Sequence, residues 1–438
     1  MALRDAYPLS RREDICGYFG KDPVDLLLVL LFALSKGRSF VVFPPEEFYL
    51  RTAMEEVRPF LFRPGKVQGD PVPVLARENP PGRAARIKIM TPAFVIYTSG
   101  TTGDPVGIRI SQESFILNAD DLFKSLAPAA GALRRYAVCT SIFTSYGLAI
   151  GMLLPLLSGG AVFPLGLEHP ARMFEKMSVV KPDCIVSNPA VLRNLAQFPK
   201  ELTAAGEMGL KLIISSGSML PEDCFRVLHD DCRIQVVDSY GTAETNAIAL
   251  KFNHYDNPFR KLPSVNIRMR PLNLPGDNEE ALYGLDVNTP KNMLGYVGNP
   301  ALTRKKMSGG SVHTGDIVTK EGDGGFRITG RLSSLIKING RRVQPEMVEK
   351  MLEKVDGVVE AYVFGRNHPV LGEILCARIV TVGKIPPDAG RMRAELARSL
   401  PAYMIPKEID PVDEIPKNNG KKSRRPFILQ YQAERPAE

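Results

Sequence analysis

The stretch that decides the fold runs from residue 97 to residue 105 and reads Tyr97-Thr98-Ser99-Gly100-Thr101-Thr102-Gly103-Asp104-Pro105. It follows a short apolar run, residues 93–97, that predicts a buried strand. The two glycines let backbone N–H groups approach an anion closely, and the hydroxyl groups add donors. We therefore expect a strand that leads into a phosphate-binding loop, although an exposed polar turn has the same composition. The spacing is not Gly-x-x-x-x-Gly-Lys-Ser/Thr, which disfavours an ordinary P-loop NTPase.

Short apolar runs alternate with helical patterns on both sides of this stretch. Further strands are expected at residues 40–43, 210–215 and 234–237. Residues 26–34 form the most apolar run, and a membrane-spanning helix needs about 20 such residues, so this run predicts a core helix. Strands that alternate with helices indicate an α/β fold with mostly parallel, covered sheets.

The pattern changes near residue 330, where Gly330-Arg331 follows a predicted turn and strand at residues 323–329. A helix is expected from Pro345, because Val348, Leu352 and Val355 follow at helical spacing. Two strands (358–364 and 374–382) and a helix (391–400) complete the pattern. We therefore expect a large N-terminal domain at residues 1–331 and a small, mobile C-terminal α+β domain at residues 332–438.

Composition excludes several classes of protein. The 438 residues are 44% apolar and 24% charged, which is ordinary for a globular protein and unlike a disordered tail or a coiled-coil rod. The net charge of +8 (56 − 48) is thinly spread and fits an anionic small ligand as well as a nucleic acid. The six cysteines lack Cys-x-x-Cys or zinc-ligand spacing, and the N-terminus lacks a signal-peptide core, so we expect a cytoplasmic protein with reduced thiols and no membrane span.

Five motifs in order resemble those of the adenylate-forming superfamily, the AMP-binding family of acyl-CoA synthetases, adenylation domains and luciferases. The loop at 97–105 is the first. The segment Asp238-Ser239-Tyr240-Gly241-Thr242-Ala243-Glu244 resembles Asn-x-Tyr-Gly-x-Thr-Glu, and His313-Thr314-Gly315-Asp316 resembles Tyr-x-Thr-Gly-Asp. Residues 330–345 resemble the family's hinge, and residues 400–406 with 416–421 resemble its C-terminal pair. The resemblance spans residues 93–425.

The resemblance implies that ATP and a carboxylic acid form an acyl-adenylate, and that a thiol of coenzyme A or of a carrier-protein phosphopantetheine then takes the acyl group. It implies a nucleotide site in which Glu244 also holds Mg²⁺, a hard cation that prefers oxygen ligands. Lys421, Glu244 and Thr98 would be catalytic, and Gly340 would let the pantetheine arm pass. The nucleotide site would comprise Thr98, Ser99, Gly100, Thr101, Thr102, Gly103, Gly217, Ser218, Asp238, Tyr240, Gly241, Asp316, Arg331 and Lys421.

The acyl pocket would be lined by Phe143-Thr144-Ser145-Tyr146-Gly147. Amino-acid-activating members of the family place a carboxylate here to pair with the substrate's ammonium group. This stretch has none, so we expect a fatty, aryl or other organic acid rather than an α-amino acid. The alternative is that these five residues only pack the core.

Several positions depart from the family pattern. Val106, Ala243 and Thr144 stand where a lysine, a threonine and a histidine are usual, so three polar groups are missing from the implied site. Asp238 replaces an asparagine, and Met347 replaces a glutamate. We still expect an active acid–thiol ligase. The alternative is a degenerate member that performs only the thioester half-reaction or merely binds acyl-adenylate or a carrier protein.

The length and the charge distribution add two expectations. Only 96 residues precede Tyr97, fewer than the family usually has, so the large domain is expected to be shortened at its N-terminus. From Ser333 to Glu438 there are 18 Lys and Arg and 14 Asp and Glu residues, so half of the net charge lies on the small domain. That basic surface suits an approach to nucleotide phosphates rather than to nucleic acid. The sequence leaves the oligomeric state, the particular acid and the choice between coenzyme A and a carrier protein open.

Overall fold

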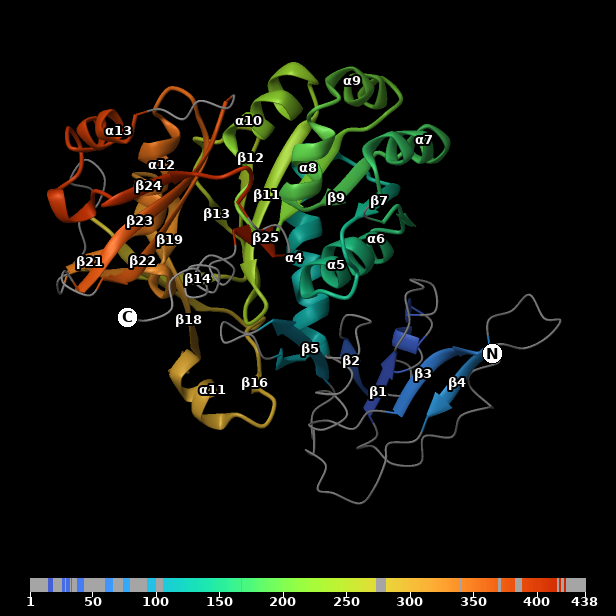
Figure 1. Cartoon of the computed structure of the whole chain (residues 1–438). Helices are drawn as coiled ribbons and strands as arrows, with labels where there is room; N and C mark the ends of the chain where they lie inside the picture. The colour runs from blue at the N-terminus through green and yellow to red at the C-terminus, as the bar shows by residue number, and fades with distance from the viewer. Residues whose placement is uncertain are drawn as a thin grey trace. The chain divides into compact units, whose positions relative to one another are not determined.

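The computed structural model describes most of the chain, including the sheets, the helices and many of the connecting loops. The described residues are 15–18, 26–27, 29–31, 33, 38–42, 60–65, 74–78, 93–99, 105–166, 168–272, 281–338, 341–368, 372–382, 388–415, 417–418 and 421–422. They form several sheets with helices beside them, as Figure 1 shows. The fold is α/β, as the alternating apolar pattern predicts.

The first sheet contains the strand that precedes the 100–104 loop. It has seven strands in the order β16-β6-β5-β2-β1-β3-β4. The four strands β3, β1, β2 and β5 pair in parallel, and β4, β6 and β16 are antiparallel to their neighbours. The strands are β1 (Ile15–Tyr18), β2 (Ser39–Val42), β3 (Phe60–Gly65), β4 (Val74–Glu78), β5 (Ala93–Ser99), β6 (Pro105–Ser111) and β16 (Gly295–Tyr296).

Two expectations from the N-terminal sequence are confirmed in this part of the chain. The strands expected at residues 40–43 and 93–97 are β2 and β5. The described residues between 26 and 33 are helical, and Leu26, Val29 and Leu30 are almost fully buried. Among the described residues, no helix is both long and apolar enough to cross a membrane.

The second sheet carries five parallel strands and an antiparallel extension, in the order β13-β12-β11-β10-β9-β7-β8. The strands expected at 210–215 and 234–237 are its central members, β10 and β11. The strands are β7 (Arg135–Cys139), β8 (Ala161–Pro164), β9 (Cys184–Ser187), β10 (Leu212–Ser216), β11 (Gln235–Thr242), β12 (Asn246–Phe252) and β13 (Arg260–Lys261).

The helices between β8 and β11 share one apolar core with the sheet, because Met177, Leu192 and Leu202 are buried in the same cluster as Ile213 and Val236. Figure 1 shows α7–α10 around these strands. The helices of this part are α4 (Gln112–Ala130), α5 (Ser145–Leu148), η1 (Ala149–Leu153), α6 (Leu154–Leu157), α7 (Pro170–Val180), α8 (Pro189–Leu195), α9 (Pro199–Glu207), α10 (Glu222–Phe225), η2 (Arg226–Asp231) and α11 (Pro300–Lys306).

Local chemistry starts several of these helices. Ser111 caps α4 by accepting a hydrogen bond from the backbone N–H of Ser114, and Asn188 caps α8 in the same way from Val191. Proline follows at the first helical position of α7, α8 and α9, where its missing N–H costs nothing. The cysteines Cys139, Cys184, Cys224, Cys232 and Cys376 are buried and form no disulfide among the described residues.

A third sheet has the order β14-β15-β18-β17, with β19 paired to β18. Its strands are β14 (Asn266–Pro271), β15 (Tyr283–Asn288), β17 (Met307–Ser308), β18 (Ser311–Lys320) and β19 (Phe326–Arg331). The strand expected at residues 326–329 is thus β19. It ends at Arg331, where the sequence predicts a break, and a short helical turn follows at Leu332–Ser334.

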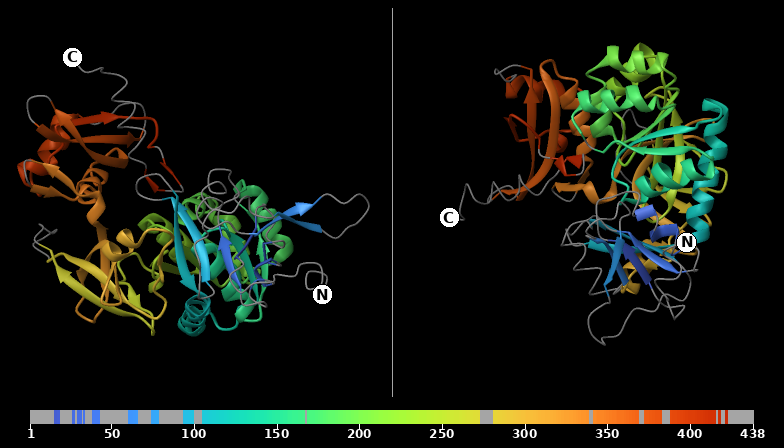
Figure 2. Two further views of the ribbon diagram at one scale, coloured as in Figure 1. Left: turned by 90° about the horizontal axis from the view of Figure 1, so that it is seen from below. Right: turned by 90° about the vertical axis from the view of Figure 1, so that its right-hand side faces the viewer.

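The C-terminal part is a small α+β unit, visible in orange and red in Figure 2. The helix expected from Pro345 is α12, and the two expected strands are β22 and β23. Val348, Leu352 and Ile379 share its core. Its elements are β20 (Ile336–Ile338), β21 (Arg341–Val343), α12 (Pro345–Glu353), β22 (Val358–His368), β23 (Gly372–Thr381), α13 (Ala389–Leu396), η5 (Ala402–Met404), β24 (Glu408–Pro411), β25 (Lys417–Asn418) and β26 (Lys421–Lys422).

The chain divides into two compact units. The first comprises residues 1–267 and 287–313, and the second comprises residues 268–286 and 314–438. Most of β18 and all of β19 therefore group with the C-terminal residues. The functional division at residues 331 and 332 stays a prediction.

Candidate functional site

Three parallel strands of the second sheet end side by side. In register, Ser187 of β9 lies beside Ser215 of β10, which lies beside Asp238 of β11. The hydroxyl of Ser216 donates to the backbone carbonyl of Ser239 over 2.6 Å, which ties β10 to β11. Because ligands of open α/β sheets bind at the carboxyl ends of the strands, this edge is the candidate site in the first unit.

The glycines at these strand ends have backbone reasons to be glycine. Gly217, directly after β10, has a φ of +96°, which L side chains rarely adopt. Gly241 lies next to a bulge in the β11–β12 pairing, and a Cβ there would lie 2.3 Å from the carbonyl oxygen of Asn246. The chain can therefore follow this edge only with glycine at both positions.

Tyr240 projects from the same strand end. Its side chain is half-buried, and its ring centroid lies 5.7 Å from that of Phe259. An aromatic ring held by such a contact and partly exposed at a strand end can stack on a planar ligand. Ser218 is half-buried after Gly217, so the structure brings Gly217, Ser218, Asp238, Tyr240 and Gly241 to one edge of the sheet.

Asp238 is almost fully buried beneath this edge. Burial raises the pKa of its carboxyl to about 6, although the positive charge of Lys251 and the backbone N–H of Leu220 act in the opposite direction. Lys251 is the partner of Asp238 in the β11–β12 register. Its ammonium lies 5.1 Å from the ring centroid of Phe225 and 4.9 Å from that of Phe259. The replacement of asparagine by Asp238 thus places a carboxyl that titrates near neutral pH inside the sheet.

Glu244 lies in the turn between β11 and β12. Its carboxylate accepts a hydrogen bond from the hydroxyl of Tyr296 over 2.7 Å, and its backbone carbonyl accepts one from the N–H of Met293. Burial would raise the pKa of Glu244, but the positive charge of Lys306 and the hydrogen bond from Tyr296 outweigh burial and lower it. The side chain is therefore an anionic oxygen ligand at neutral pH, which is what a hard divalent cation binds.

A buried ion pair supports this turn from beneath. The ammonium of Lys291, which has no exposed surface, lies 2.7 Å from a carboxylate oxygen of Asp121 on α4. It also donates to the carbonyl of Ala247 over 2.9 Å, and the amide of Asn246 donates to the carbonyl of Lys291. The hydroxyl of Ser264 donates to the same Asp121 oxygen. These bonds tie the start of β12 to α4 and to the 289–293 segment.

Sequence reasoning misses Tyr296, Lys291 and Asp121. They lie outside the motifs, and Tyr296 is 52 residues from the carboxylate that it contacts. The sequence offers only a weak signal for two of them. Asp121 lies in a helix with other charged residues, and Lys291 lies in a polar loop.

The segment predicted to line the acyl pocket lies at the same edge of the sheet. Thr144 caps α5, because its hydroxyl accepts from the N–H of Gly147 over 3.0 Å and donates to the carbonyl of Ser141. The hydroxyl of Tyr146 lies 2.8 Å from the carbonyl of Ser187 and 3.0 Å from that of Ile214, near the ends of β9 and β10. Tyr146 therefore anchors the segment to the sheet.

The other residues of this segment differ in exposure. Phe143 and Gly147 are buried, Ser145 is half-buried and Thr144 is exposed. A Cβ on Gly147 would lie 2.0 Å from the carbonyl oxygen of Ser141, so a tight turn requires this glycine. Lining of an acyl pocket by these residues stays a prediction.

In the second unit, the structure brings Asp316 and Arg331 together. They are partners in the β18–β19 register, and the guanidinium Nε of Arg331 lies 2.8 Å from a carboxylate oxygen of Asp316. Arg331 also donates to the carbonyl of Thr314, and the N–H of Asp316 donates to the hydroxyl of Thr314. The Asp316 side chain is only 7% exposed, whereas that of Arg331 is 46% exposed. The pair offers a fixed carboxylate acceptor and an accessible cation.

The remaining predicted site residues are described only in part or lie outside the described residues. Thr98 and Ser99 end β5, and Lys421 begins β26, where its backbone pairs with Asn418. Gly340 and the loop residues Gly100, Thr101, Thr102 and Gly103 lie outside the described residues. Their roles stay predictions.

Comparison with known families gives two matches in chain order. Residues 40–273 match the AMP-binding enzyme family, and residues 347–422 match the AMP-binding enzyme C-terminal domain. The first match alone covers more than half of the chain.

Two curated relatives are similar over most of the chain. A sulfoacetate–CoA ligase from Cupriavidus necator is 28% identical over 78% of this chain and 67% of its own. A 3,4-dihydroxybenzoate–[aryl-carrier protein] ligase from Bacillus anthracis is 26% identical over 92% of this chain and 88% of its own. Among solved structures, ATP-bound MatB from Rhodopseudomonas palustris has a TM-score of 0.78 and 20% identity over 96% of this chain and 89% of that chain, which shows the shared fold.

Breaking the buried ion pair should destabilise the first unit. Replacing Asp121 by Asn leaves the Lys291 ammonium buried without its counter-charge, which we expect to cost about 3–5 kcal/mol in the free energy of unfolding, measured by urea denaturation. The double variant Asp121→Leu with Lys291→Met should lose less than Asp121→Asn, because it leaves no uncompensated charge. Equal losses in the two proteins would contradict this account.

Asp238 should make stability depend on pH. Its pKa is about 6 in the folded chain against 3.8 for a free carboxyl, so the neutral form favours folding, and this contribution is present below about pH 4 and is lost as the pH rises through 6. As the pH rises from 4 to 7, the wild type should therefore lose up to about 3 kcal/mol of unfolding free energy relative to Asp238→Asn. The measurement is urea denaturation of both proteins across this range. A difference that does not change with pH would refute the assignment.

Proposed function

The chain belongs to the AMP-binding enzyme family, and from this membership we propose that it uses ATP to convert a carboxylic acid into an acyl-adenylate and then transfers the acyl group to a thiol. The acceptor thiol is that of coenzyme A or of a carrier-protein phosphopantetheine. The observation that carries the proposal is the ordered pair of family matches, with Tyr240 near the end of β11 and Glu244 in the turn after it, both inside the first match. The similarity to a CoA ligase and to an aryl-carrier protein ligase supports the same reaction class.

The physical problem in the first step is the attack of one anion on another. A carboxylate oxygen must bond to the α-phosphorus of ATP while the bond to pyrophosphate breaks, so positive charge and aligned donors must offset the repulsion. We propose that Lys421 and Arg331 supply cationic charge and that the 98–103 loop supplies hydroxyl and backbone donors. Magnesium, when bound, adds positive charge at the phosphates.

Glu244 fits the role of magnesium ligand. Its lowered pKa keeps it anionic, and the Tyr296 hydroxyl occupies one of its oxygens and so orients the carboxylate. The hydrogen bond from Met293 to the backbone of Glu244 fixes the turn itself. Positioning of this kind lowers the cost of assembling a charged site, because the group does not have to reorganise when the ligand binds.

Each unit also offers residues that we propose contact the adenine or the ribose of the nucleotide. In the first unit, Tyr240 offers its ring to adenine beside Gly217 and Ser218. In the second unit, Asp316 accepts hydrogen bonds from the ribose hydroxyls, while Arg331 holds one of its oxygens. A carboxylate accepts several hydrogen bonds, so the ion pair leaves acceptor capacity for the sugar.

The acid is proposed to be an organic acid without an α-ammonium group. The segment 143–147 has no carboxylate, and the Thr144 hydroxyl is committed to capping α5. Tyr146 is anchored by two backbone carbonyls, so it sets the position of the segment rather than reaching for a charged group. Neither residue can supply the anion that an α-amino acid requires.

Replacement of Lys421 by Ala tests adenylation. We expect acid-dependent exchange of labelled pyrophosphate into ATP to fall by roughly 100-fold or more, because the ammonium that offsets phosphate charge is lost. Thioester formation from synthetic acyl-AMP should persist. The acid panel should include sulfoacetate, 3,4-dihydroxybenzoate, benzoate and short dicarboxylates.

The matched control is Lys422→Ala, which removes the neighbouring ammonium of the same short strand β26. Loss of exchange in both variants would point to a general charge effect and refute the specific assignment of Lys421. No exchange by the wild type with any acid, together with turnover of synthetic acyl-AMP, would favour the alternative of a thioester-only enzyme in which Val106 and Ala243 mark the lost half-reaction.

Replacement of Tyr296 by Phe tests the positioning of Glu244. The variant removes one hydrogen bond to a charged carboxylate, so the pKa of Glu244 should rise and the magnesium concentration needed for half-maximal exchange should increase by roughly tenfold. The acidic limb of the pH–rate profile should move to higher pH. Tyr283→Phe, which keeps the ring that lies against Lys320, is the control. An unchanged magnesium dependence in Tyr296→Phe would contradict the proposed role.

A further inference from the structure

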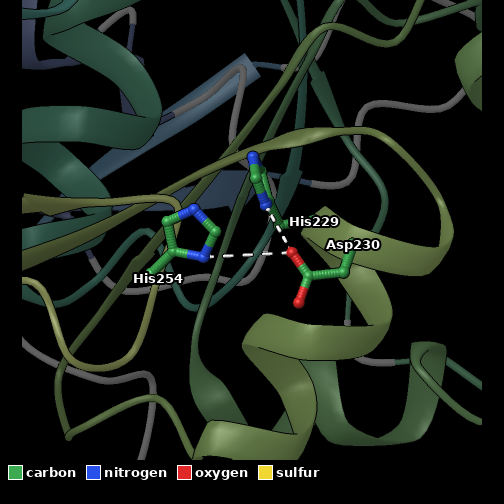
Figure 3. Close-up of side chains that lie close together, drawn as sticks. All are labelled: His229, Asp230 and His254. Carbon is green, nitrogen blue, oxygen red and sulfur yellow. Dashed lines mark hydrogen bonds and ion pairs between the residues drawn. The ribbon is translucent and has the colours of Figure 1, made fainter.

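Two histidines and an aspartate that are separated in the sequence meet on the surface of the first unit. Figure 3 shows His229, Asp230 and His254 with their side chains turned toward one another. One ligand atom from each of the three residues lies within 4.8 Å of the other two. The chain has only five histidines, and two of them have ring centroids 4.7 Å apart here.

The backbone of two connected elements builds this cluster. His229 and Asp230 lie on the last turn of η2, which runs into β11 after Arg233, a residue with a φ of +60°. His254 lies in the turn after β12, where its N–H donates to the carbonyl of Phe252. Asn253 fixes that turn against β11, because its side chain accepts from the N–H of Val236 and its N–H donates to the Val236 carbonyl.

The cluster lies away from the candidate active site. It precedes β11 and follows β12, so it lies at the amino end of β11, whereas Tyr240 lies near the carboxyl end of that strand and Glu244 lies in the turn beyond it. The proposed acid activation does not use it. The side chains are accessible, with exposed fractions of 23% for His229, 47% for Asp230 and 58% for His254.

We propose that His229, Asp230 and His254 form a zinc-binding site, with water as the fourth ligand. Imidazole nitrogens and a carboxylate oxygen are ligands that zinc prefers, and three protein ligands with one open position is a common zinc arrangement. An oxygen of Asp230 lies 2.8 Å from Nδ1 of His229 and 3.9 Å from Nδ1 of His254. Tetrahedral zinc with bonds of about 2.0–2.1 Å separates its ligand atoms by about 3.4 Å, so small side-chain rotations suffice.

The charges of the cluster are compatible with a cation. The Asp230 carboxylate accepts a hydrogen bond from Nδ1 of His229 over 2.8 Å. Zinc would take the place of the proton at Nδ1 of His229, with the imidazole in the tautomer that carries its proton on Nε2. Among the described side chains of this unit, the cysteines that could compete for zinc are buried; they are Cys139, Cys184, Cys224 and Cys232.

Such an ion would cross-link two elements of the first unit. It would join η2 to the turn after β12 and so close a loop that contains the whole β11–β12 hairpin, including the candidate active-site residues 238–244. A ligand that binds only the folded chain stabilises it by mass action, so zinc should raise the melting temperature without entering the reaction.

Metal titration of the full chain without an affinity tag tests the proposal. After treatment with a chelating resin, isothermal titration calorimetry should show one Zn²⁺ bound per chain. Co²⁺ should give the visible absorption bands of a four-coordinate site and should be displaced by Zn²⁺. The variants His229→Asn and His254→Asn should each weaken zinc affinity by roughly tenfold or more, because each removes a ligand. Circular dichroism checks that each variant is folded.

His169→Asn is the matched control. It removes an imidazole elsewhere in the same unit, and asparagine can keep the cap that the His169 side chain provides to the N–H of Ala171. Its zinc affinity should equal that of the wild type. Absence of Zn²⁺ binding by the wild type at about 100 μM metal, or equal affinity in the wild type and both cluster variants, would overturn the proposal.

Discussion

The candidate site in the first unit depends on one buried interaction, the ion pair between Lys291 and Asp121. An ammonium and a carboxylate removed from water are costly unless each is paired and hydrogen-bonded. Here the ammonium also binds the carbonyl of Ala247, and the carboxylate also accepts from Ser264. These bonds therefore hold the start of β12 in one position, directly after the turn that carries Glu244.

Further hydrogen bonds hold the turn that carries Glu244. Asn246 has a left-handed φ of +57° and binds the carbonyl of Lys291, while the backbone of Glu244 is held by Met293. The turn is therefore built before any ligand arrives, and the Tyr296 hydroxyl aligns the carboxylate at its tip. A preorganised carboxylate binds a cation more strongly than a mobile one, because it does not have to reorganise on binding.

Two of the five departures from the family pattern, Thr144 and Asp238, have local contacts in the structure. Thr144 is used locally, since its hydroxyl caps α5 and braces the turn at Ser141. Asp238 introduces a buried carboxyl opposite Lys251 in the strand register. The ammonium of Lys251 also lies over the aromatic rings of Phe225 and Phe259. Both substitutions therefore have structural partners, and neither is a polar group that has simply been lost.

The sequence by itself determined the fold class, the order of the elements and the strand-end position of the motif residues. Strands such as β5, β10 and β11 are short apolar runs bounded by turn residues, and Gly217 and Gly241 mark backbone conformations that other residues cannot adopt. Local patterns of this kind depend on neighbours in the chain, so they can be read without the fold.

Only the tertiary structure decided which distant residues support the site. Three interactions join residues that are distant in the sequence. Tyr296 contacts Glu244 from 52 positions away, and Lys291 pairs with Asp121 from 170 positions away. His254 lies 24 positions after Asp230 and meets it and His229 from a separate element. Such pairs carry no local signal, because a buried lysine or a surface histidine has the same neighbours in the chain whether or not it has a partner in space. Packing brings the partners together, and the cost of burying an unpaired charge then makes their arrangement specific.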